Sequence, residues 1–418
     1  MNLKLFLKQY IKMFSQNCML PVYYAGYAKK PVKPGLTVFA DAHHDARPEN
    51  MQLLYEALEQ KKKENPELNL EIRELYLNYQ KASPAAVLKA MFQFMKWYAQ
   101  AGSVVICDNF LPAASCKKRK ETKVVQLWHA CGSFKKFGYD TEDDIPKQYH
   151  GNVFQNTDLV TVSAPGCVKP FASAMRLEEK NVQPIGVSRT DVYYSSDWKE
   201  NCRREFYSLY PEAAGKRVIL WAPTFRGNPG EPQLVKLNLQ RLQQKLGDEW
   251  LVISHVHPHM HEQYKDTDCK MASERLFPVT DVLIADYSSL IYEYLLFDGT
   301  MVLYVPDLEE YQSKRGFYLD FDEIPGTKVF DEEELPEVIE RQYENWKRYG
   351  ADKSGNRPGK SEPKQPSASQ PEPAAQKWLR QTESDPEKRK QFIHKYMSNC
   401  DGHATERIVE YILEGVKS

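Results

Sequence analysis

A short apolar run that ends at a carboxylate is the feature that most constrains how this chain folds. Residues 282–285 are apolar throughout, as expected of a parallel strand buried on both faces. Asp286 ends the run, and Ser288 and Ser289 then offer hydroxyls that can cap the helix predicted to follow. This order places polar groups at the carboxyl edge of a parallel sheet, where open α/β sheets hold phosphorylated ligands. An ordinary strand–turn–helix unit also explains the stretch.

The same pattern recurs and predicts an α/β fold. In the first half we expect helices at 49–61, 85–100 and 168–175, and strands at 36–40, 104–108, 124–128, 159–163 and ending at 185–186. After Asp191 the pattern starts afresh, with strands at 218–222, 251–255, 282–285 and 301–305. Repeated strand–loop–helix units indicate doubly wound parallel sheets. We therefore expect two Rossmann-like domains, at residues 31–190 and 200–350.

Residues 1–30 differ from the rest in charge. No acidic residue precedes Asp41, and Lys4, Lys8 and Lys12 recur every fourth position among apolar residues. On a helix they form one stripe, which predicts a basic amphipathic segment suited to the surface of an anionic membrane. A first helix packed on the domain explains the pattern equally well. Because no run of 18 apolar residues exists, no membrane-spanning helix is expected.

Residues 351–390 break the pattern with six prolines among Ser, Gln, Lys and Glu. This composition predicts a low-complexity insertion. Residues 391–418, with a helix at about 403–414, are expected to complete the fold. The eight cysteines include no C-x-x-C pair, which favours free thiols in a reducing cytosol over disulfides or a zinc site. No nucleic-acid partner is expected.

Residues at predicted strand ends are those needed to hold a diphosphate and move a proton. They are His129, Thr224, Arg226, His257, Asp286, Ser288 and Ser289. The chain has no G-x-G-x-x-G after its first strand, no G-x-x-x-x-G-K-[ST] and no G-x-S-x-G. Dinucleotide oxidoreductase, P-loop NTPase and nucleophile-elbow hydrolase functions are therefore disfavoured.

Each of these residues also has a simpler explanation. His129 can be a structural hydrogen-bonding group beside a buried strand, and Arg315 can clamp a phosphate or cap a helix. The histidines at 255, 257, 259 and 261, and the loop Asp41–Asp45, are spaced in ways that suggest metal ligands. Pro258 interrupts the first group, and a plain polar loop is the better interpretation of the second. We therefore predict no metal site.

Eight motifs, in order, resemble those of the CDP-glycerol glycerophosphotransferase family, which builds or primes teichoic-acid polymers. They are Gln126–His129, Gly186–Asp191, Trp221–Arg226, His257–Pro258, Asp281–Ser289, Asp307–Tyr311, Arg315–Tyr318 with Pro325–Gly326, and Asp401–Ala404. The family's W-H-G is Trp128-His129-Ala130 here, and its R-x-H is His255-Val256-His257. The resemblance covers residues from about 100 to the C-terminus, apart from the insertion.

This resemblance implies a GT-B fold, with a lipid-linked acceptor bound by the first half and the donor by the second. The implied reaction transfers glycerol phosphate from CDP-glycerol to an acceptor hydroxyl and releases CMP. His129 would be the general base, since an imidazole of ordinary pKa, about 6.5, is largely neutral near neutral pH. His257 would be the second catalytic residue.

The resemblance also implies a donor site and a location. The residues expected to hold the donor and its phosphates are Arg189, Pro223, Thr224, Arg226, His255, His257, Asp286, Ser288, Ser289, Glu293 and Arg315. No organic cofactor is expected. The enzyme would act peripherally at the cytoplasmic face of the membrane. Three alternatives stay open: transfer from CDP-ribitol or another CDP-alditol, a GT-B glycosyltransferase, and a non-catalytic nucleotide-binding partner.

Overall fold

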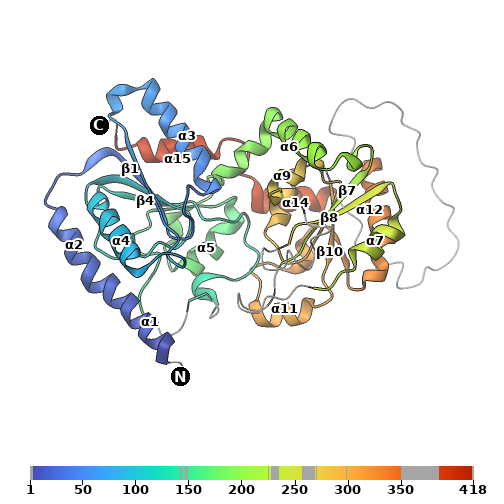
Figure 1. Ribbon diagram of the computed structural model, residues 1–418, viewed down its shortest axis with the longest axis horizontal. Coiled ribbons are helices and arrows are strands. Elements are labelled where there is room, and N and C mark those ends of the chain that lie inside the picture. The colour runs from blue at the N-terminus through green and yellow to red at the C-terminus, as the bar shows by residue number, and fades with distance from the viewer. Residues whose placement is uncertain are drawn as a thin grey trace. The chain divides into compact units, whose positions relative to one another are not determined.

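The chain forms two compact units, each built on one parallel sheet (Figure 1). The computed structural model describes residues 3–141, 144–145, 149–224, 226, 235–256, 269, 271–297, 299–349 and 386–416, with only the backbone for 3–8 and 348–349. Unit 1 comprises Met1–Tyr194 with Lys395–Ser418, and unit 2 comprises Ser195–His394. The predicted fold class, α/β with two Rossmann-like parallel-sheet domains, is confirmed.

Unit 1 contains a six-stranded sheet in the order β2-β1-β3-β4-β5-β6. Its strands are β1 (Lys33–Asp41), β2 (Glu71–Tyr76), β3 (Ala101–Ile106), β4 (Lys123–Gln126), β5 (Leu159–Thr161) and β6 (Val182–Gln183). Its helices are α1 (Leu3–Phe14), a π-helical turn (Ser15–Met19), α2 (Leu20–Tyr27), α3 (Glu49–Glu64), α4 (Pro84–Tyr98), α5 (Val168–Met175) and α15 (Ala404–Leu413). The chain pairs β2 on one side of β1 and then β3 on the other, so the topological switch point lies between β1 and β3.

Side chains of the central strands of unit 1 alternate between two cores, as the two-residue period of a strand requires. Val38 and Val104 pack on one face of the sheet, with apolar residues of α2 and α4. Phe39 and Val105 pack on the opposite face, with residues of α3 and α15. Both faces of the sheet are therefore covered, which explains why its inner strands are apolar runs.

Unit 2 contains a five-stranded sheet in the order β11-β10-β9-β7-β8. Its strands are β7 (Arg217–Ala222), β8 (Trp250–Ser254), β9 (Val282–Ala285), β10 (Thr300–Tyr304) and β11 (Thr327–Val329). Its helices are α6 (Ser196–Leu209), α7 (Leu239–Leu246), α9 (Ser273–Leu276), α10 (Leu290–Tyr294), α11 (Leu308–Arg315), α12 (Leu335–Tyr349) and most of α14 (Pro386–Met397). The chain pairs β8 on one side of β7 and then β9 on the other, so the switch point of this sheet lies between β7 and β9.

Polar residues begin several helices where the sequence offers them. The side chains of Ser83, Ser195 and Asn238 accept hydrogen bonds from backbone N–H groups in the first turns of α4, α6 and α7. β2 was not predicted from the sequence. All of its residues are half-buried, and half of them are charged. A charged edge strand lacks the apolar run by which inner strands are recognised.

Residues 386–390 were expected to belong to the insertion but form the first turns of α14. Pro386 begins this helix and Glu387 follows it, and both residue types are favoured in a first helical turn. Arg389 donates hydrogen bonds to the carbonyl oxygens of Leu295 and Gly299, which anchors the helix in unit 2. The rest of the predicted insertion, residues 351–385, lies outside the described residues.

Candidate active site

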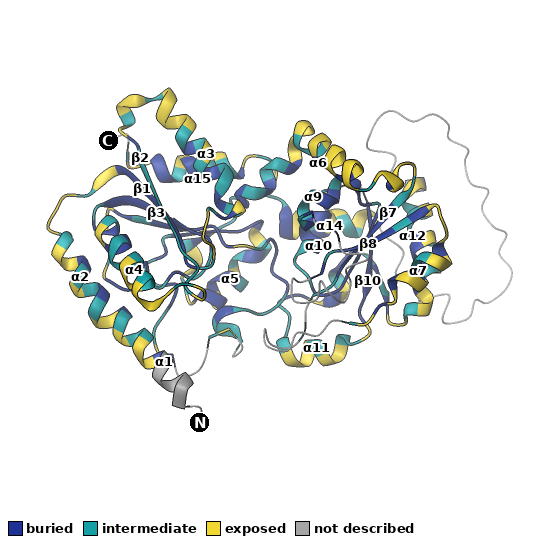
Figure 2. Ribbon diagram, in the orientation of Figure 1, coloured by how far each residue is buried: buried dark blue, intermediate teal, exposed yellow. Residues whose placement is uncertain are grey.

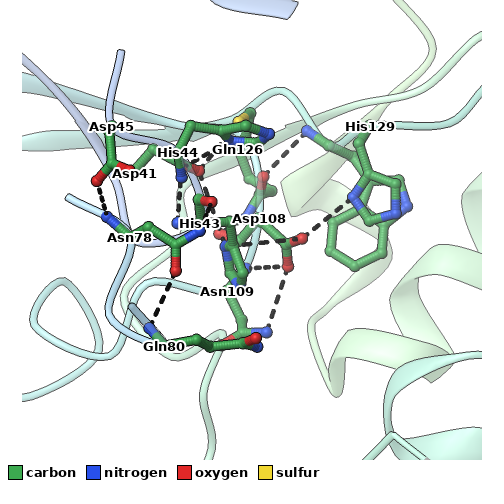
Figure 3. A network of polar contacts seen from close by, with 12 residues as sticks. Asp41, His43, His44, Asp45, Asn78, Gln80, Asp108, Asn109, Gln126 and His129 are labelled. Atoms are coloured by element: carbon green, nitrogen blue, oxygen red, sulfur yellow. Dashed lines mark hydrogen bonds and ion pairs between the residues drawn. The ribbon is translucent and has the colours of Figure 1, made fainter. Parts of the chain in front are cut away.

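Three loops of unit 1 bring ionisable side chains together at the carboxyl ends of adjacent strands (Figure 3). Asp41 ends β1 and is followed by His43, Asp108 follows β3, and His129 follows β4. The loops after β1 and β3 flank the switch point of this sheet. Ligands of open α/β sheets bind at such a position because the adjacent connections diverge there and leave a crevice.

Asp41 is the buried anchor of the first loop. Its Oδ1 accepts hydrogen bonds from the backbone N–H groups of His43 and His44, at 2.7 and 2.8 Å, and lies 2.9 Å from His44 Nδ1. Cys107 donates its thiol hydrogen to Oδ2, at 3.4 Å. Burial alone would raise the pKa of Asp41, but the hydrogen bonds from His43 and His44 outweigh it and hold this pKa well below its usual range. Asp41 is therefore ionised at neutral pH.

His43 lies between two carboxylates. Its Nδ1 is 3.9 Å from Asp41 Oδ2 and 4.0 Å from Asp108 Oδ2, distances of an ion pair rather than of a hydrogen bond. The contact with Asp41 is the largest influence and raises the pKa of His43. Burial opposes this rise, and the negative charge of Asp108 adds to it.

Asp108 also faces His129, whose Nδ1 lies 3.4 Å from Asp108 Oδ2. Burial would raise the pKa of Asp108, but the interaction with His129 and the charge of His43 lower it overall. The His129 side chain is 49% exposed, and its ring stacks on that of Trp128 with the centroids 4.3 Å apart. His129 is thus held on one side and open to a substrate.

The backbone that carries His129 is fixed by three polar contacts. Trp128 has a φ of 56°, an uncommon conformation for a bulky residue, and its N–H donates to Gln126 Oε1. Gln126 Nε2 in turn donates to the carbonyl oxygen of Asp108, at 2.9 Å. Arg189 donates from Nη1 to the carbonyl oxygen of His129, at 2.8 Å, and to Asn50 Oδ1, at 2.7 Å. Gln126 therefore ties the ends of β3 and β4 together.

The other motif residues near Arg189 hold the C-terminal segment. Gly186 has a φ of +94°, and a Cβ there would lie 2.2 Å from the carbonyl oxygen of Asn399. The carboxylate of Asp191 accepts from the N–H groups of Ala404 and Thr405, at 3.1 and 2.7 Å, and so caps α15. The motif thus joins the loop that carries His129 to the last helix of unit 1.

In unit 2, the ends of β7 and β9 are linked across the second switch point. Asp286 is 2% exposed, and its two oxygens accept from the backbone N–H of Thr224 at 2.9 and 3.1 Å. Thr224 Oγ1 is buried without a hydrogen-bond partner. A hydroxyl in this state, at a strand end, is available to a ligand oxygen.

Arg226 is enclosed by carboxylates and aromatic rings. Its Nη1 lies 2.5 Å from Asp286 Oδ2, and its Nε and Nη2 donate to the two oxygens of Asp307, at 3.0 and 3.1 Å. The guanidinium carbon lies 4.9 and 5.2 Å from the ring centroids of Tyr287 and Tyr311. Burial would lower the pKa of Arg226, but the charge of Asp286 and the contacts with Asp307 raise it overall. Direct phosphate binding by Arg226 and Asp286 stays a prediction, whereas this geometry favours a role in positioning Thr224.

The other predicted donor residues of unit 2 lie near the strand ends. Pro223 and His255 are half-buried after β7 and β8, and His255 Nδ1 lies 3.3 Å from the carbonyl oxygen of Cys269. The hydroxyl of Ser288 accepts from the N–H of Leu290, whereas Ser289 occupies the N-cap position of α10 without a side-chain capping hydrogen bond. Two more predicted residues lie farther along the chain. Glu293 is buried in α10, and Arg315 ends α11.

Among the predicted residues, His129 and Arg189 come together in unit 1, and Thr224, Arg226 and Asp286 in unit 2. The predicted catalytic residue His257 lies outside the described residues, so its role stays a prediction. Asp108 and the pairing of His43 with it were missed. No group of three or more His, Cys, Asp or Glu side chains that could hold a metal ion occurs in the part of the chain that the structure describes.

Comparison with known proteins places this chain in a family. The model of the family described as CDP-Glycerol:Poly(glycerophosphate) glycerophosphotransferase matches residues 22–355. The teichoic acid ribitol-phosphate primase of Bacillus spizizenii W23 is 34% identical over 334 residues, which cover 75% of this chain and 84% of the primase. The teichoic acid glycerol-phosphate primase of Bacillus subtilis 168 is 30% identical over 283 residues, or 62% of this chain and 70% of that one.

A solved structure agrees with the fold. The wall teichoic acid polymerase TagF superimposes with a TM-score of 0.70 at 18% identity, and the match covers 98% of both chains. The family model spans most of this chain, and the ribitol-phosphate primase is similar over most of its own length. This chain therefore belongs to the CDP-glycerol:poly(glycerophosphate) glycerophosphotransferase family.

Proposed function

We propose that this protein transfers an alditol phosphate from a CDP-alditol to a hydroxyl of a lipid-linked or polymeric acceptor, with release of CMP. The observation that carries the proposal is His129, a half-exposed imidazole on a fixed backbone at the carboxyl edge of the unit 1 sheet. Family membership supports the donor class, since relatives are named as primases and polymerases of ribitol phosphate and glycerol phosphate.

The reaction needs one proton acceptor. The oxygen of the acceptor hydroxyl attacks the phosphorus that carries the alditol, and its proton passes to His129. The bond from that phosphorus to the CMP oxygen breaks, and CMP leaves as a phosphate anion. Such a transfer is catalysed mainly by positioning and by charge stabilisation. We assign charge stabilisation to His257, Thr224, Ser288 and Ser289, in keeping with the strand-end positions of the described members of this set. No organic cofactor takes part in this scheme.

A donor assay tests the proposal directly. The purified protein is incubated with acceptor and with CDP-glycerol, CDP-ribitol or UDP-sugars, each labelled in the group to be transferred. We expect label transfer and CMP release from CDP-glycerol, and transfer from CDP-ribitol alone would identify the other alditol. Transfer from a UDP-sugar alone, or donor binding without turnover, would contradict the proposal. Parallel reactions with a chelator and with added Mg²⁺ determine any metal requirement.

A single substitution tests the assignment of His129 as the general base. His129→Ala should lower the rate of CMP release by roughly 10²-fold or more, because general base catalysis typically contributes about that factor. His150→Ala, a change at an exposed histidine of the same unit, is the matched control and should leave the rate unchanged. Equal rates for His129→Ala and wild type, with acceptor present, would refute the assignment.

We also propose that the protein acts peripherally at the cytoplasmic face of an anionic membrane, where a lipid-linked acceptor meets a cytosolic donor. The exposed side of the first helices supports this, and Figure 2 shows exposed stretches on α1 and α2. Ile11, Phe14 and Val22 are 56, 55 and 75% exposed, whereas Gln9 and Gln16 are buried. Leu20 and Tyr24 of the same segment are buried in the core of unit 1, so these exposed apolar side chains lie on the opposite, outer side of the helices, where an ordinary surface helix carries polar residues. None of the described helices is both long and apolar enough to cross a bilayer.

The lysines have a smaller part in this proposal than the sequence suggested. Lys12 is half-buried, with its Nζ 4.6 Å from the centroid of the Tyr149 ring, so its side chain packs on unit 1. The side chains of Lys4 and Lys8 lie outside the described part of the chain. Charge still contributes, because each basic residue near an anionic surface is worth about 1 kcal/mol.

Vesicle sedimentation tests this location. Wild type should pellet with anionic vesicles more than with neutral ones, and less at high salt. A triple variant, Ile11→Ser, Phe14→Ser and Val22→Ser, should lose most of this binding. Leu88→Ser, at an exposed apolar residue of α4, is the control that should keep it. A second variant changes Lys4, Lys8 and Lys12 to Glu. Undiminished pelleting of both multiple variants at low salt would refute membrane binding through this segment.

A further inference from the structure

One carboxylate oxygen in unit 1 faces two imidazole rings. Asp108 Oδ2 lies 3.4 Å from Nδ1 of His129 and 4.0 Å from Nδ1 of His43, with Asp108 between the two rings (Figure 3). The other oxygen, Oδ1, is taken by Asn109, which donates from its backbone N–H and from Nδ2, at 2.5 and 3.2 Å. Asp108 is thus oriented by its neighbour with Oδ2 turned to the histidines.

The charge of Asp108 determines where the hydrogen of His129 sits. Although burial opposes ionisation, contact with His129 and the charge of His43 lower the pKa of Asp108, so the carboxylate is ionised near neutral pH. An ionised carboxylate has no hydrogen to donate and can only accept one. The carboxylate therefore favours the His129 tautomer with its hydrogen on Nδ1, the nitrogen that faces Asp108. Nε2 is then left with its lone pair free.

This tautomer is the one that a general base needs. We propose that Asp108 is a positioning residue of the transferase reaction, which holds His129 with hydrogen on Nδ1 so that Nε2 can take the proton of the acceptor hydroxyl. The inference rests on the proposed function. The hydrogen moves from the hydroxyl to Nε2, and the imidazolium that forms is stabilised by the negative charge of Asp108.

Contacts made by backbone groups hold the loops of Asp108 and His129 together, so the loops do not depend on the contact between these two side chains. The side chain of Gln126 is fully buried and joins the carbonyl oxygen of Asp108 to the N–H of Trp128, at 2.9 and 3.0 Å. Arg189 holds the carbonyl oxygen of His129. Asp108→Asn should therefore preserve the fold of both loops while replacing an acceptor by an amide whose NH₂ can donate to Nδ1. The variant separates positioning from folding.

The matched control is Asp158→Asn in the same unit. Asp158 also accepts a backbone hydrogen bond, from the N–H of Val124 at 2.7 Å, but its ion pair is with Lys118. Two measurements are made on wild type and both variants. The first is ¹⁵N NMR of histidine-labelled, substrate-free protein, with His129→Ala to identify the His129 ring signals. The second is steady-state CMP release, separated into kcat and the KM for the CDP-alditol.

In wild type and Asp158→Asn we expect His129 with hydrogen on Nδ1. In Asp108→Asn the hydrogen should move toward Nε2, and kcat should fall by about 10²–10⁴-fold with KM changed by less than about 3-fold. An Nε2–H tautomer in wild type, or an unchanged tautomer and kcat in Asp108→Asn, would overturn the inference. The NMR readout needs no substrate. A wild type with the expected tautomer that releases no CMP would refute the transferase function while supporting the contact with Asp108.

Discussion

The contributions of His43 and Asp41 to the stability of the fold change with pH in opposite directions. The pKa of His43 is raised above that of an unfolded chain, about 6.5, so its stabilising contribution is complete below that pH and is lost as pH rises through the raised pKa. The pKa of Asp41 is lowered, so its contribution is complete above the unfolded value near 4 and is lost in acid. His43 is one-third exposed, so solvent screening limits its contribution to about 0.5 kcal/mol.

The first prediction concerns His43 itself. Its titration midpoint, followed by NMR of the ring, should lie above 6.5 in wild type. Asp41→Asn should lower this midpoint, since contact with Asp41 is the largest cause of the rise. Asp45→Asn is the control and should leave the midpoint in place, because Asp45 Oδ1 accepts from the N–H of Asn78 across the loop. A wild-type midpoint at or below 6.5 would contradict the assigned contacts.

Individual residues were recognised from the sequence when they followed an apolar run. His129 was recognised in this way, and Asp108 satisfies the same rule after residues 104–107 but was counted as the last residue of its strand. His43 lies in a loop that also suits a plain polar turn. His43 comes close to Asp108 only because β1 lies beside β3 in the sheet. Local sequence patterns do not predict the order of strands in a sheet. The pairing was therefore beyond local prediction.

At the scale of elements, one side chain holds three of them together in unit 2. Arg226 follows β7, Asp286 follows β9, and Asp307 immediately precedes α11. The side chain of Arg226 is only 14% exposed, so its removal would leave two carboxylates facing each other with little access to water. Breaking one partner of a buried ion pair typically costs about 3–5 kcal/mol.

The second prediction compares two arginines of unit 2. Arg226→Met should lower the melting temperature of the protein by several degrees and weaken CDP-alditol binding, because Thr224 loses its fixed position. Arg241→Met removes a surface arginine that pairs with Glu332 and Glu333, and should cost no more than about 1 kcal/mol. Thermal unfolding and donor titration measure both effects. Equal melting temperatures for the two variants would show that Arg226 does not clamp the strand ends.

Elements were predicted best where both sides of the sheet are covered. The strand at 282–285 has the predicted bounds because it is an uninterrupted apolar run, and the helix at 168–175 also has the predicted bounds. β2 and β11 were missed. They lie at the edges of their sheets, where polar residues are tolerated and the apolar signal is weak.

At the scale of the whole molecule, the two parts of the predicted insertion at 351–390 should differ in how much they contribute to the stability of the fold. Residues 351–385 include few apolar residues whose burial could offset the entropy of ordering. Residues 386–390 are different, because they include Arg389, which donates to the carbonyl oxygens of Leu295, Phe297 and Gly299. The two parts of the predicted insertion should therefore respond differently to replacement.

The third prediction is a pair of linker variants. Replacing 351–385 with a short Gly/Ser linker should leave the melting temperature within a few degrees of wild type. Replacing 351–390 should lower it further, because three carbonyl oxygens lose their partner. Calorimetry of both proteins gives the comparison. If the shorter replacement abolished cooperative unfolding, residues 351–385 would have to belong to a packed element.

Two domains could be predicted from the restart of the strand pattern after Asp191. The return of the last helix to unit 1 could not, because the residues that receive it are scattered along the first 191 positions of the chain. Gly186, Asp191 and Ser163 each hold part of the C-terminal segment, the last by donating to the carbonyl oxygen of Tyr396 at 2.7 Å. Contacts between residues more than two hundred positions apart leave no local signal.

This return has a consequence for biosynthesis. A ribosome delivers the strands of unit 1 first, then the whole of unit 2, and only afterwards Lys395–Ser418. Until then, the sheet face that contains Phe39 and Val105 lacks the apolar residues of α15, among them Ile408 and Ile412. While unit 2 is being translated, α3 therefore covers this face without α15, and the apolar surface left exposed makes the nascent chain prone to aggregation.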